Sequence, residues 1–338
     1  MEKEVKPTIK GKLILATPED EGFLLYTMRN FKDAVEYAHS LMRKGVGENE
    51  IVKLLTSRIL HNKWYSYSAY KRAKLYREQQ YLKLRKPQLF SVGSRDERGN
   101  RNIKFISTDR VKIKIPSVSG RHRWIIGEVR FSKKHLPIVQ ELVNATTSYG
   151  AGVYLKKNRF EIHVNVPLEL YIKHLRKKSR NKIVGYIAGF DFNPDRVCMV
   201  IIDQRGIVRD IRNEHFPEVT SHGFPKEKSG QVRREALAKL VEYARNHGVK
   251  YYVIEKLSKP KPKGGRKAKR KISKMALREF TQQMEVLVPK VDGKLIMVNP
   301  AYSSISARII AGDLGLDVHT ASAYIIALRG VRKSNKSI

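Results

Sequence analysis

Cysteine, acidic residues and long apolar runs are all scarce in this sequence of 338 residues. The one cysteine, Cys198, excludes a disulfide framework and a cysteine zinc site, and its place in an apolar run indicates a core residue. No apolar run reaches the roughly 20 residues that span a bilayer, and the start Met-Glu-Lys-Glu is unlike a signal peptide. These absences predict an intracellular, cytoplasmic protein with no membrane partner. A prokaryotic or viral host is expected.

The shortage of acidic residues leaves a large positive charge. The chain has 68 Lys and Arg against 32 Asp and Glu, a formal net charge of +36. Such an excess predicts a polyanionic partner and an affinity that falls steeply with salt. The alternative is a solvated cationic surface, as in a basic ribosomal-type protein, which still implies nucleic acid nearby.

The C-terminal half has a pattern of strands and helices that brings two carboxylates together. The strands are expected at residues 182–190, 196–203, 207–211 and 250–254, with a helix at 231–247 before the fourth strand. Asp191 follows the first of these strands and Glu255 follows the fourth. A right-handed crossover between parallel strands places both residues at the same edge of the sheet.

Two carboxylates at one sheet edge are a candidate site for Mg²⁺ or Mn²⁺, because hard divalent cations prefer oxygen ligands. Two such ions supply what phosphodiester hydrolysis needs, namely an activated water and neutralised phosphate charge. Asp317 and His319 open a predicted C-terminal helix and complete the candidate set of catalytic and metal-binding residues. The simpler alternatives are that Asp191 forms a turn and that Asp317 caps the helix, with His319 packed on its first turn.

The N-terminal half predicts a different architecture. Residues 8–16 read as a strand, residues of about 20–90 as helices, and residues 102–166 as strands of period two. We therefore expect an α+β lobe over 1–180, a small β-barrel with inserted helices. An α/β domain of RNase H type is expected over 181–338.

Two segments are candidate nucleic-acid contacts. In the third predicted helix, 65–84, tyrosines alternate with cations in a way that suits base stacking and phosphate contact; a buried tyrosine stripe is the alternative. The candidates there are Tyr67, Tyr70, Lys71, Arg72, Lys74 and Arg77. About half of the residues between Glu255 and Met275 are basic, a composition typical of segments that order on a phosphate backbone. Its candidates are Lys261, Lys263, Arg266, Lys267, Lys269, Arg270 and Lys271.

Four segments of the C-terminal half carry a family resemblance. They are Gly189–Asp195, Val253–Leu257, Val298–Ser304 and Gly315–Ala323. In this order they resemble the RuvC-type nuclease motifs of the TnpB family, which are transposon-associated, RNA-guided DNA endonucleases related to type V CRISPR effectors. The resemblance implies a RuvC domain, a guide RNA and a target DNA as partners, and Asp191 and Glu255 as the first two metal ligands. The third ligand it implies is His319 or, after a shift of two residues, Asp317.

The chain departs from the family pattern in one respect that matters for metals. Many members carry a four-cysteine zinc ribbon before the last motif, and this chain has no cysteine there, so it resembles a zinc-free branch and no zinc is expected. Two alternatives remain open: an RNA-guided DNA-binding protein that does not cut, and a guide-independent, structure-selective nuclease acting as a homodimer. An actin-like sugar kinase is disfavoured because glycine-rich phosphate loops are missing.

Overall fold

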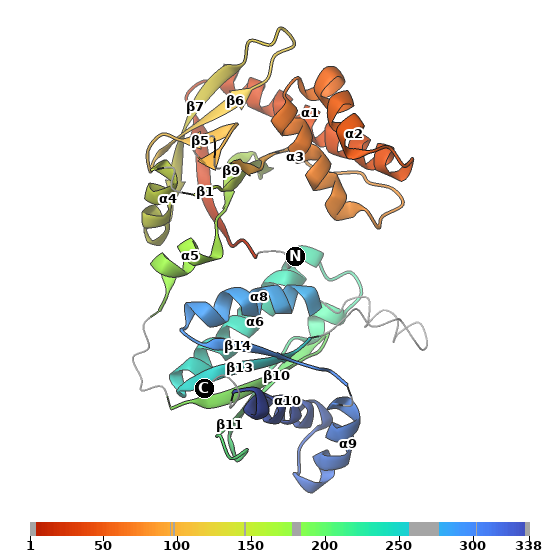
Figure 1. The fold of residues 1–338 in the computed structure, drawn as a ribbon, viewed down its shortest axis with the longest axis vertical. Coiled ribbons are helices and arrows are strands. Elements are labelled where there is room, and N and C mark those ends of the chain that lie inside the picture. The colour runs from red at the N-terminus through yellow and green to blue at the C-terminus, as the bar shows by residue number, and fades with distance from the viewer. Residues whose placement is uncertain are drawn as a thin grey trace. The chain divides into compact units, whose positions relative to one another are not determined.

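A computed structural model of the chain describes residues 5–94, 96, 99–144, 147–177, 184–256, 277–301 and 303–334. The chain divides into two compact units, Met1–His174 and Leu175–Ile338. Each unit has a main sheet of its own (Figure 1). None of the helices in the described ranges combines the length and hydropathy needed to cross a bilayer.

The main sheet of the N-terminal unit has seven antiparallel strands in the order β2-β8-β9-β1-β7-β6-β5. They are β1 (Thr8–Leu15), β2 (Gln88–Ser91), β5 (Ile103–Phe105), β6 (Arg110–Ile115), β7 (Arg123–Phe131), β8 (Gly150–Lys156) and β9 (Arg159–Asn165). Two short strands, β3 (Gly93–Ser94) and β4 (Gly99–Asn100), come between β2 and β5 in the sequence and pair with each other. Along β6, Val111, Ile113 and Ile115 are buried, so the period of two in the sequence correctly identifies the inward face.

Two fully or almost fully buried polar residues connect the edges of this sheet. Asn100 Nδ2 donates to the carbonyls of Ser91 (3.1 Å) and Tyr149 (3.0 Å), beside β2 and β8. Its Oδ1 accepts from the backbone N–H of Ile103 at 3.0 Å, in β5. The Tyr149 hydroxyl donates to the Ile103 carbonyl (3.0 Å) and accepts from the Phe105 N–H (3.2 Å). Because these bonds join the two edges, the sheet is nearly closed into a barrel.

The helices inserted between β1 and β2 pack as one group. They are α1 (Pro18–Arg43), α2 (Glu48–Leu55), the π-helical η1 (Thr56–Leu60), α3 (Lys63–Ala73) and the 3₁₀-helical η2 (Lys74–Tyr76). The third helix was predicted to reach residue 84, but helical structure ends at Tyr76. Beyond it Leu82 is buried, and the Leu84 N–H donates to Glu36 Oε1 at 2.6 Å, so tertiary contacts with α1 replace the helix. Shorter helices α4 (Leu136–Val143) and α5 (Leu168–Leu175) lie outside the insertion.

Asn100 gives a test of barrel closure. We expect Asn100→Ala to lower the free energy of unfolding by on the order of 3 kcal/mol, because several buried backbone groups lose their partners at once. Urea denaturation followed by circular dichroism measures this. Asn49→Ala, at an exposed position on α2, should change the free energy by less than about 0.5 kcal/mol; equal effects of the two substitutions would contradict the closing role of Asn100.

The C-terminal unit has a five-stranded mixed sheet in the order β12-β11-β10-β13-β14. Its elements are β10 (Tyr186–Phe192), β11 (Arg196–Ile202), β12 (Val208–His215), α6 (Lys226–Asn246), β13 (Val249–Glu255), α8 (Leu277–Lys290), β14 (Lys294–Val298), α9 (Ser303–Asp313) and α10 (Val318–Ser334). Strands β10, β11 and β12 form the predicted antiparallel meander, and β13 pairs in parallel with both β10 and β14. Helices α6 and α8 cover one face and α10 covers the other (Figure 1).

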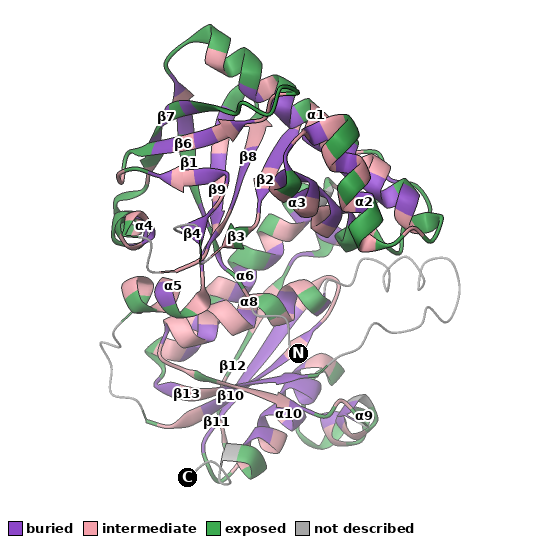
Figure 2. Cartoon of the chain, turned by 45° about the horizontal axis from the view of Figure 1, so that its top comes forward, coloured by how far each residue is buried: buried purple, intermediate pink, exposed green. Residues whose placement is uncertain are grey.

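The predicted fold class is therefore confirmed. An α+β unit with a barrel-like sheet and inserted helices is followed by an α/β unit with the strand order and crossovers of the RNase H-like (RuvC) type. Figure 2 shows how the residues of β10 and β13 alternate little in burial, as expected for central strands covered on both faces. Cys198, in β11, is buried as predicted, and burial raises the pKa of its thiol to about 12.

Two details differ from the expectations. Asp191 and Glu255 do not follow their strands but lie within them: Asp191 pairs with Cys198 and Glu255 with Val298. Helix α9 was not among the elements predicted from the sequence. It packs small residues, Ala307 and Ala311, against α10, and an alanine stripe of this kind gives little periodic signal in a sequence.

Candidate active site

Asp191 and Glu255 lie side by side on one face of the sheet. The parallel register pairs Phe190 of β10 with Ile254 of β13, so the next residues along the two strands are the two carboxylates. Side chains alternate between faces in a strand. Ile187 and Val253, which have the same parity as Asp191 and Glu255, pack in the cluster formed with α10. Both carboxylates therefore belong to the α10 face, near the ends of adjacent strands.

Helix α10 is held against this face by an approach that only glycine permits. A Cβ added at Gly189, two residues before Asp191, would lie 2.2 Å from the Ala323 carbonyl oxygen and 2.4 Å from the Ala327 nitrogen. One added at Gly330, further along α10, would lie 2.3 Å from Val253 Cγ2 in β13. Because the backbones of β10 and α10 almost touch, the start of α10 is fixed close to Asp191.

The start of α10 delivers His319 to Asp191. Nδ1 of His319 lies 3.4 Å from Asp191 Oδ2, which also accepts a hydrogen bond from Asn193 Nδ2 at 2.7 Å. The interaction with Asp191 raises the pKa of the His319 imidazole, although partial burial acts in the opposite direction. The structure thus brings together Asp191 and His319, two residues separated by more than a hundred positions in the chain.

Glu255 is buried and only partly satisfied. It is 7% exposed, and its Oε1 has no hydrogen-bond partner within the described residues. Burial raises the pKa of this carboxyl, and the nearby Asp191 charge raises it further. Among the described residues, Arg329 of α10 lies close to Glu255, with its Nη1 4.0 Å from Glu255 Oε1.

No pattern in the sequence indicated that Arg329 would lie at the site. It donates to the backbone carbonyls of Asn299 (2.5 Å) and Ala301 (2.7 Å), and so fixes the turn that follows β14. It reaches Glu255 because α10 crosses the strands. Thr320, near the start of the helix, accepts from Asn213 of β12, and Lys333, near its end, donates to the Met297 carbonyl of β14.

The donor set on this face fits a divalent cation. Glu255 Oε1, which is buried and has no hydrogen-bond partner among the described residues, and the carboxylate of Asp191 beside it are ligand types that Mg²⁺ and Mn²⁺ prefer. The His319 imidazole suits Mn²⁺ better than Mg²⁺. In the part of the chain that the structure describes, however, no three acidic, histidine or cysteine side chains already form a ligand cluster. Among the described residues the expected four-residue centre is therefore not preassembled as one cluster.

Asp317 acts as the N-cap of α10. Its Oδ1 accepts from the backbone N–H groups of His319 (3.0 Å) and Thr320 (3.3 Å), and its Oδ2 accepts from the Thr320 hydroxyl. Partial burial acts to raise the pKa of the Asp317 carboxyl, but these hydrogen bonds outweigh it and hold the pKa below its ordinary value. Of the two residues, His319 is the one whose side chain lies against Asp191, while Asp317 is engaged in capping the helix.

The predicted nucleic-acid residues of α3 fall on different faces of the helix. Lys71 Nζ lies 5.0 Å from the centre of the Tyr67 ring, on a face where Tyr67 also meets Trp64 edge-on. Tyr70 is buried at 7% exposure, so the alternative of a buried tyrosine applies to it. Arg72 donates to Gln88 Oε1 at 3.4 Å, and Lys74 and Arg77 are exposed. The lysine-rich candidates Lys261, Lys263, Arg266, Lys267, Lys269, Arg270 and Lys271 lie outside the described residues.

Comparison with known proteins places the chain in a family. Residues 7–176 match the family described as the SSO2105 N-terminal domain. The Saccharolobus solfataricus protein SSO2105 is 34% identical over 351 residues, which cover 97% of this chain and 93% of that protein. The chain belongs to the SSO2105 family. A further relative, from Aeropyrum pernix, is 25% identical over 242 residues, 64% of this chain and 63% of that protein.

Solved structures offer distant likenesses to this SSO2105-family chain. A Cas12f1–sgRNA–target DNA complex covers 91% of the chain and 82% of its own length, with 10% identity and a TM-score of 0.47. Thermus thermophilus RuvC in complex with a Holliday junction covers 45% of this chain and 96% of its own length, with 15% identity and a TM-score of 0.30. The fold assignment rests on strand order and register rather than on these scores.

Gly189 tests how α10 is held in this family member. We expect Gly189→Ala to lower the free energy of unfolding by about 1–3 kcal/mol, since the added methyl group overlaps the backbone of α10. Chemical denaturation gives the value. Gly312→Ala, in α9 where an added Cβ meets nothing within 4 Å, should be neutral or stabilising by up to about 1 kcal/mol. A Gly189→Ala protein as stable as wild type would mean that α10 is free to shift.

Asp317 gives a separate test of the cap. Asp317→Ala should cost about 1 kcal/mol of stability, whereas Asp317→Asn should cost at most a few tenths, because asparagine caps as well as aspartate. Thermal and urea unfolding of the two variants, compared with wild type, measure the difference. Equal losses of stability in both variants would show that α10 depends on the charge of Asp317 and not on its capping geometry.

Proposed function

We propose that this SSO2105-family protein is a divalent-metal-dependent DNA endonuclease guided by RNA. The observation that carries the proposal is the pair Asp191 and Glu255, on adjacent parallel strands of an RNase H-like sheet, with His319 at 3.4 Å from Asp191. The net charge of +36 supports a nucleic-acid substrate. The resemblance of four C-terminal segments to TnpB motifs supports a DNA target and a guide RNA.

Each side chain has a definite task in this proposal. Asp191, Glu255 and His319 would hold Mg²⁺ or Mn²⁺, and the chemistry that such ions supply when bound is the activation of water and the stabilisation of phosphate charge. Asn193 donates to Asp191 Oδ2 at 2.7 Å and so orients this carboxylate. Arg329 limits the charge that builds up at Glu255 and fixes the following turn.

The guide-RNA part of the proposal rests on the N-terminal unit and on the motif resemblance. In RNA-guided nucleases the protein grips the heteroduplex by its backbone, while base pairing reads the sequence. A barrel with an inserted helical group and many exposed cations is suited to such contacts. Under this proposal sequence specificity comes from the RNA and not from side chains of this chain.

Loss of one carboxylate tests the cutting role. We expect Asp191→Asn to lower Mg²⁺-dependent plasmid cleavage at least about 100-fold, because the ligand charge is lost while the shape of the side chain is kept. The assay uses protein purified together with its co-expressed RNA. Calorimetric titration of Mn²⁺ should show the same variant losing metal affinity, and Asp313→Asn, an exposed change in α9, is the matched control.

The same assay separates the alternatives. Cleavage that survives removal of the RNA would identify a guide-independent nuclease, and RNA-directed binding without cleavage by wild type would identify an inactive descendant. Cleavage by His319→Gln and by Asp317→Asn shows which of the two residues is the third metal ligand. The proposal requires that His319→Gln lose cleavage. Wild-type levels of cleavage in both Asp191→Asn and Glu255→Gln would overturn the active-site assignment.

A further inference from the structure

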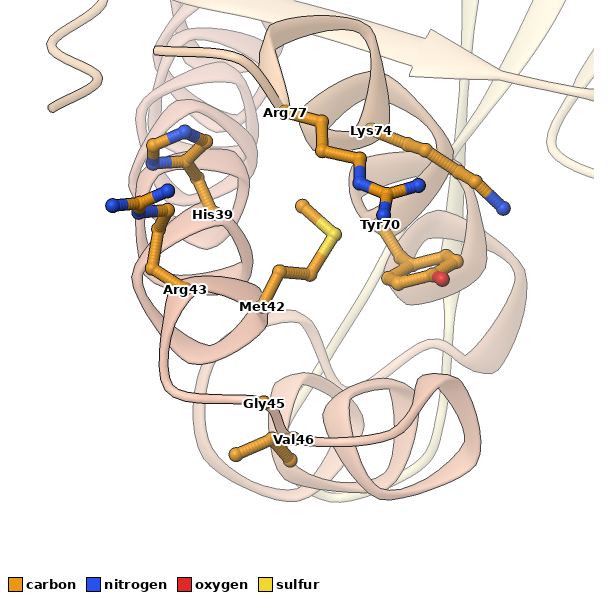
Figure 3. A pocket seen from close by; sticks show the side chains of 8 residues that line it. All are labelled: His39, Met42, Arg43, Gly45, Val46, Tyr70, Lys74 and Arg77. Carbon is orange, nitrogen blue, oxygen red and sulfur yellow. The ribbon is translucent and has the colours of Figure 1, made fainter. Parts of the chain in front are cut away.

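A cavity of about 400 Å³ lies among the inserted helices of the N-terminal unit, far along the chain from the carboxylates. The end of α1, the turn after it, α3 and the segment just beyond η2 form its wall (Figure 3). Its volume is within the range of roughly 300–1,000 Å³ that is usual for small-molecule sites, and it is much larger than a phosphate ion needs.

The wall of the cavity is positively charged. Arg43, Lys74 and Arg77 are among its described lining residues, none of which is acidic. A carboxylate, that of Glu48, is tied to the wall by a hydrogen bond from the Tyr70 hydroxyl. All three cations are exposed at the rim. Figure 3 shows Arg77 extending towards Tyr70 across the cavity. Three cations around one concave surface favour an anion, and guanidinium groups suit phosphate oxygens in particular.

The inner surface is apolar and aromatic. Met42 extends into the space between the helices (Figure 3), and Tyr70 presents its ring. Burial raises the pKa of Tyr70, and so does the hydrogen bond between its hydroxyl and Glu48. With the hydroxyl held in this way, Tyr70 offers the cavity only the exposed part of its ring, since 7% of the residue is exposed. Lys74 Nζ lies 5.9 Å from the ring centre, which places a cation and an aromatic surface together.

A buried histidine fixes the segment that carries Arg77. His39 is 3% exposed, and its Nε2 lies 3.1 Å from the carbonyl oxygen of Tyr76. A carbonyl only accepts, so Nε2 carries the proton and donates. This bond ties the end of η2 to α1, so Arg77 is held over the cavity although the helix has already ended.

From these features we infer that the cavity binds a single unstacked nucleotide. The phosphate lies against Lys74 and Arg77, with Arg43 adding positive charge from the opposite side of the cavity (Figure 3), and the base lies against Met42 and the exposed part of Tyr70. Stacking of a base on an aromatic ring, with the backbone held by cations, is the general mode by which proteins bind unpaired nucleotides. The nucleotide is either a free mononucleotide or one unit of a single strand. This inference concerns binding alone and is independent of whether the C-terminal unit cuts DNA.

The test measures binding by the full-length protein in EDTA, where metal-dependent cleavage does not occur. The probes are adenosine 5′-monophosphate, inorganic phosphate, and a fluorescent twelve-residue oligothymidylate that carries one 5-iodouracil. We expect Arg43→Gln/Arg77→Gln to weaken nucleotide binding at least about tenfold. The matched control, Lys53→Gln/Arg58→Gln, removes two exposed positive charges from the same helical group outside the cavity and should weaken it less than about twofold.

The outcomes distinguish the sources of the nucleotide. Saturable adenosine monophosphate binding that the cavity variant weakens identifies a free nucleotide. Oligonucleotide binding with the same sensitivity, and photocrosslinking of the iodouracil to Tyr70 or Met42, identifies a nucleotide within a strand. Equal weakening by the control pair, inorganic phosphate binding as tightly as both nucleotide probes, or binding insensitive to the cavity variant each overturns the proposal. Circular dichroism confirms that the variants are folded.

Discussion

The arrangement of the C-terminal unit depends on the close approach of α10 to Gly189. An added Cβ would lie 2.2 Å from a carbonyl oxygen of that helix, so any larger residue would push α10 away from the sheet. The helix carries His319 at its start and Arg329 three turns later, and both reach the carboxylates on the strands below. A backbone contact two residues from Asp191 therefore sets the geometry of the whole candidate site.

This geometry places two like charges together, partly buried, and that is unfavourable without a cation. The protein offsets the repulsion with Arg329 beside Glu255 and with His319 beside Asp191. Glu255 Oε1 still lacks a hydrogen bond within the described residues. A site that keeps a buried, unsatisfied carboxylate is costly for folding, and that cost is understandable if the carboxylate serves a metal ion.

The N-terminal unit depends on polar contacts of a different kind. Asn100 and Tyr149 join the edges of its sheet through buried hydrogen bonds, and His39 ties the end of η2 to α1. Both devices connect segments that have no periodic signal of their own. The first device nearly closes the barrel and the second holds the helical group around its cationic cavity. Both parts of the unit are therefore stabilised by contacts between side chains and backbone groups distant in the chain, which a periodic sequence pattern does not reveal.

The sequence by itself determined the element types, the fold class and the position of Asp191 and Glu255 near the ends of adjacent strands, because period-two runs and a helical crossover constrain topology. It left Asp317 and His319 as alternatives, missed α9 and Arg329, and extended the third helix to residue 84. Only the tertiary structure decided what these residues contact and where these elements begin and end. The N-cap bonds of Asp317, the path of α10 across the strands and the packing of Leu82 depend on residues distant in the chain, and local pattern carries no information about such contacts.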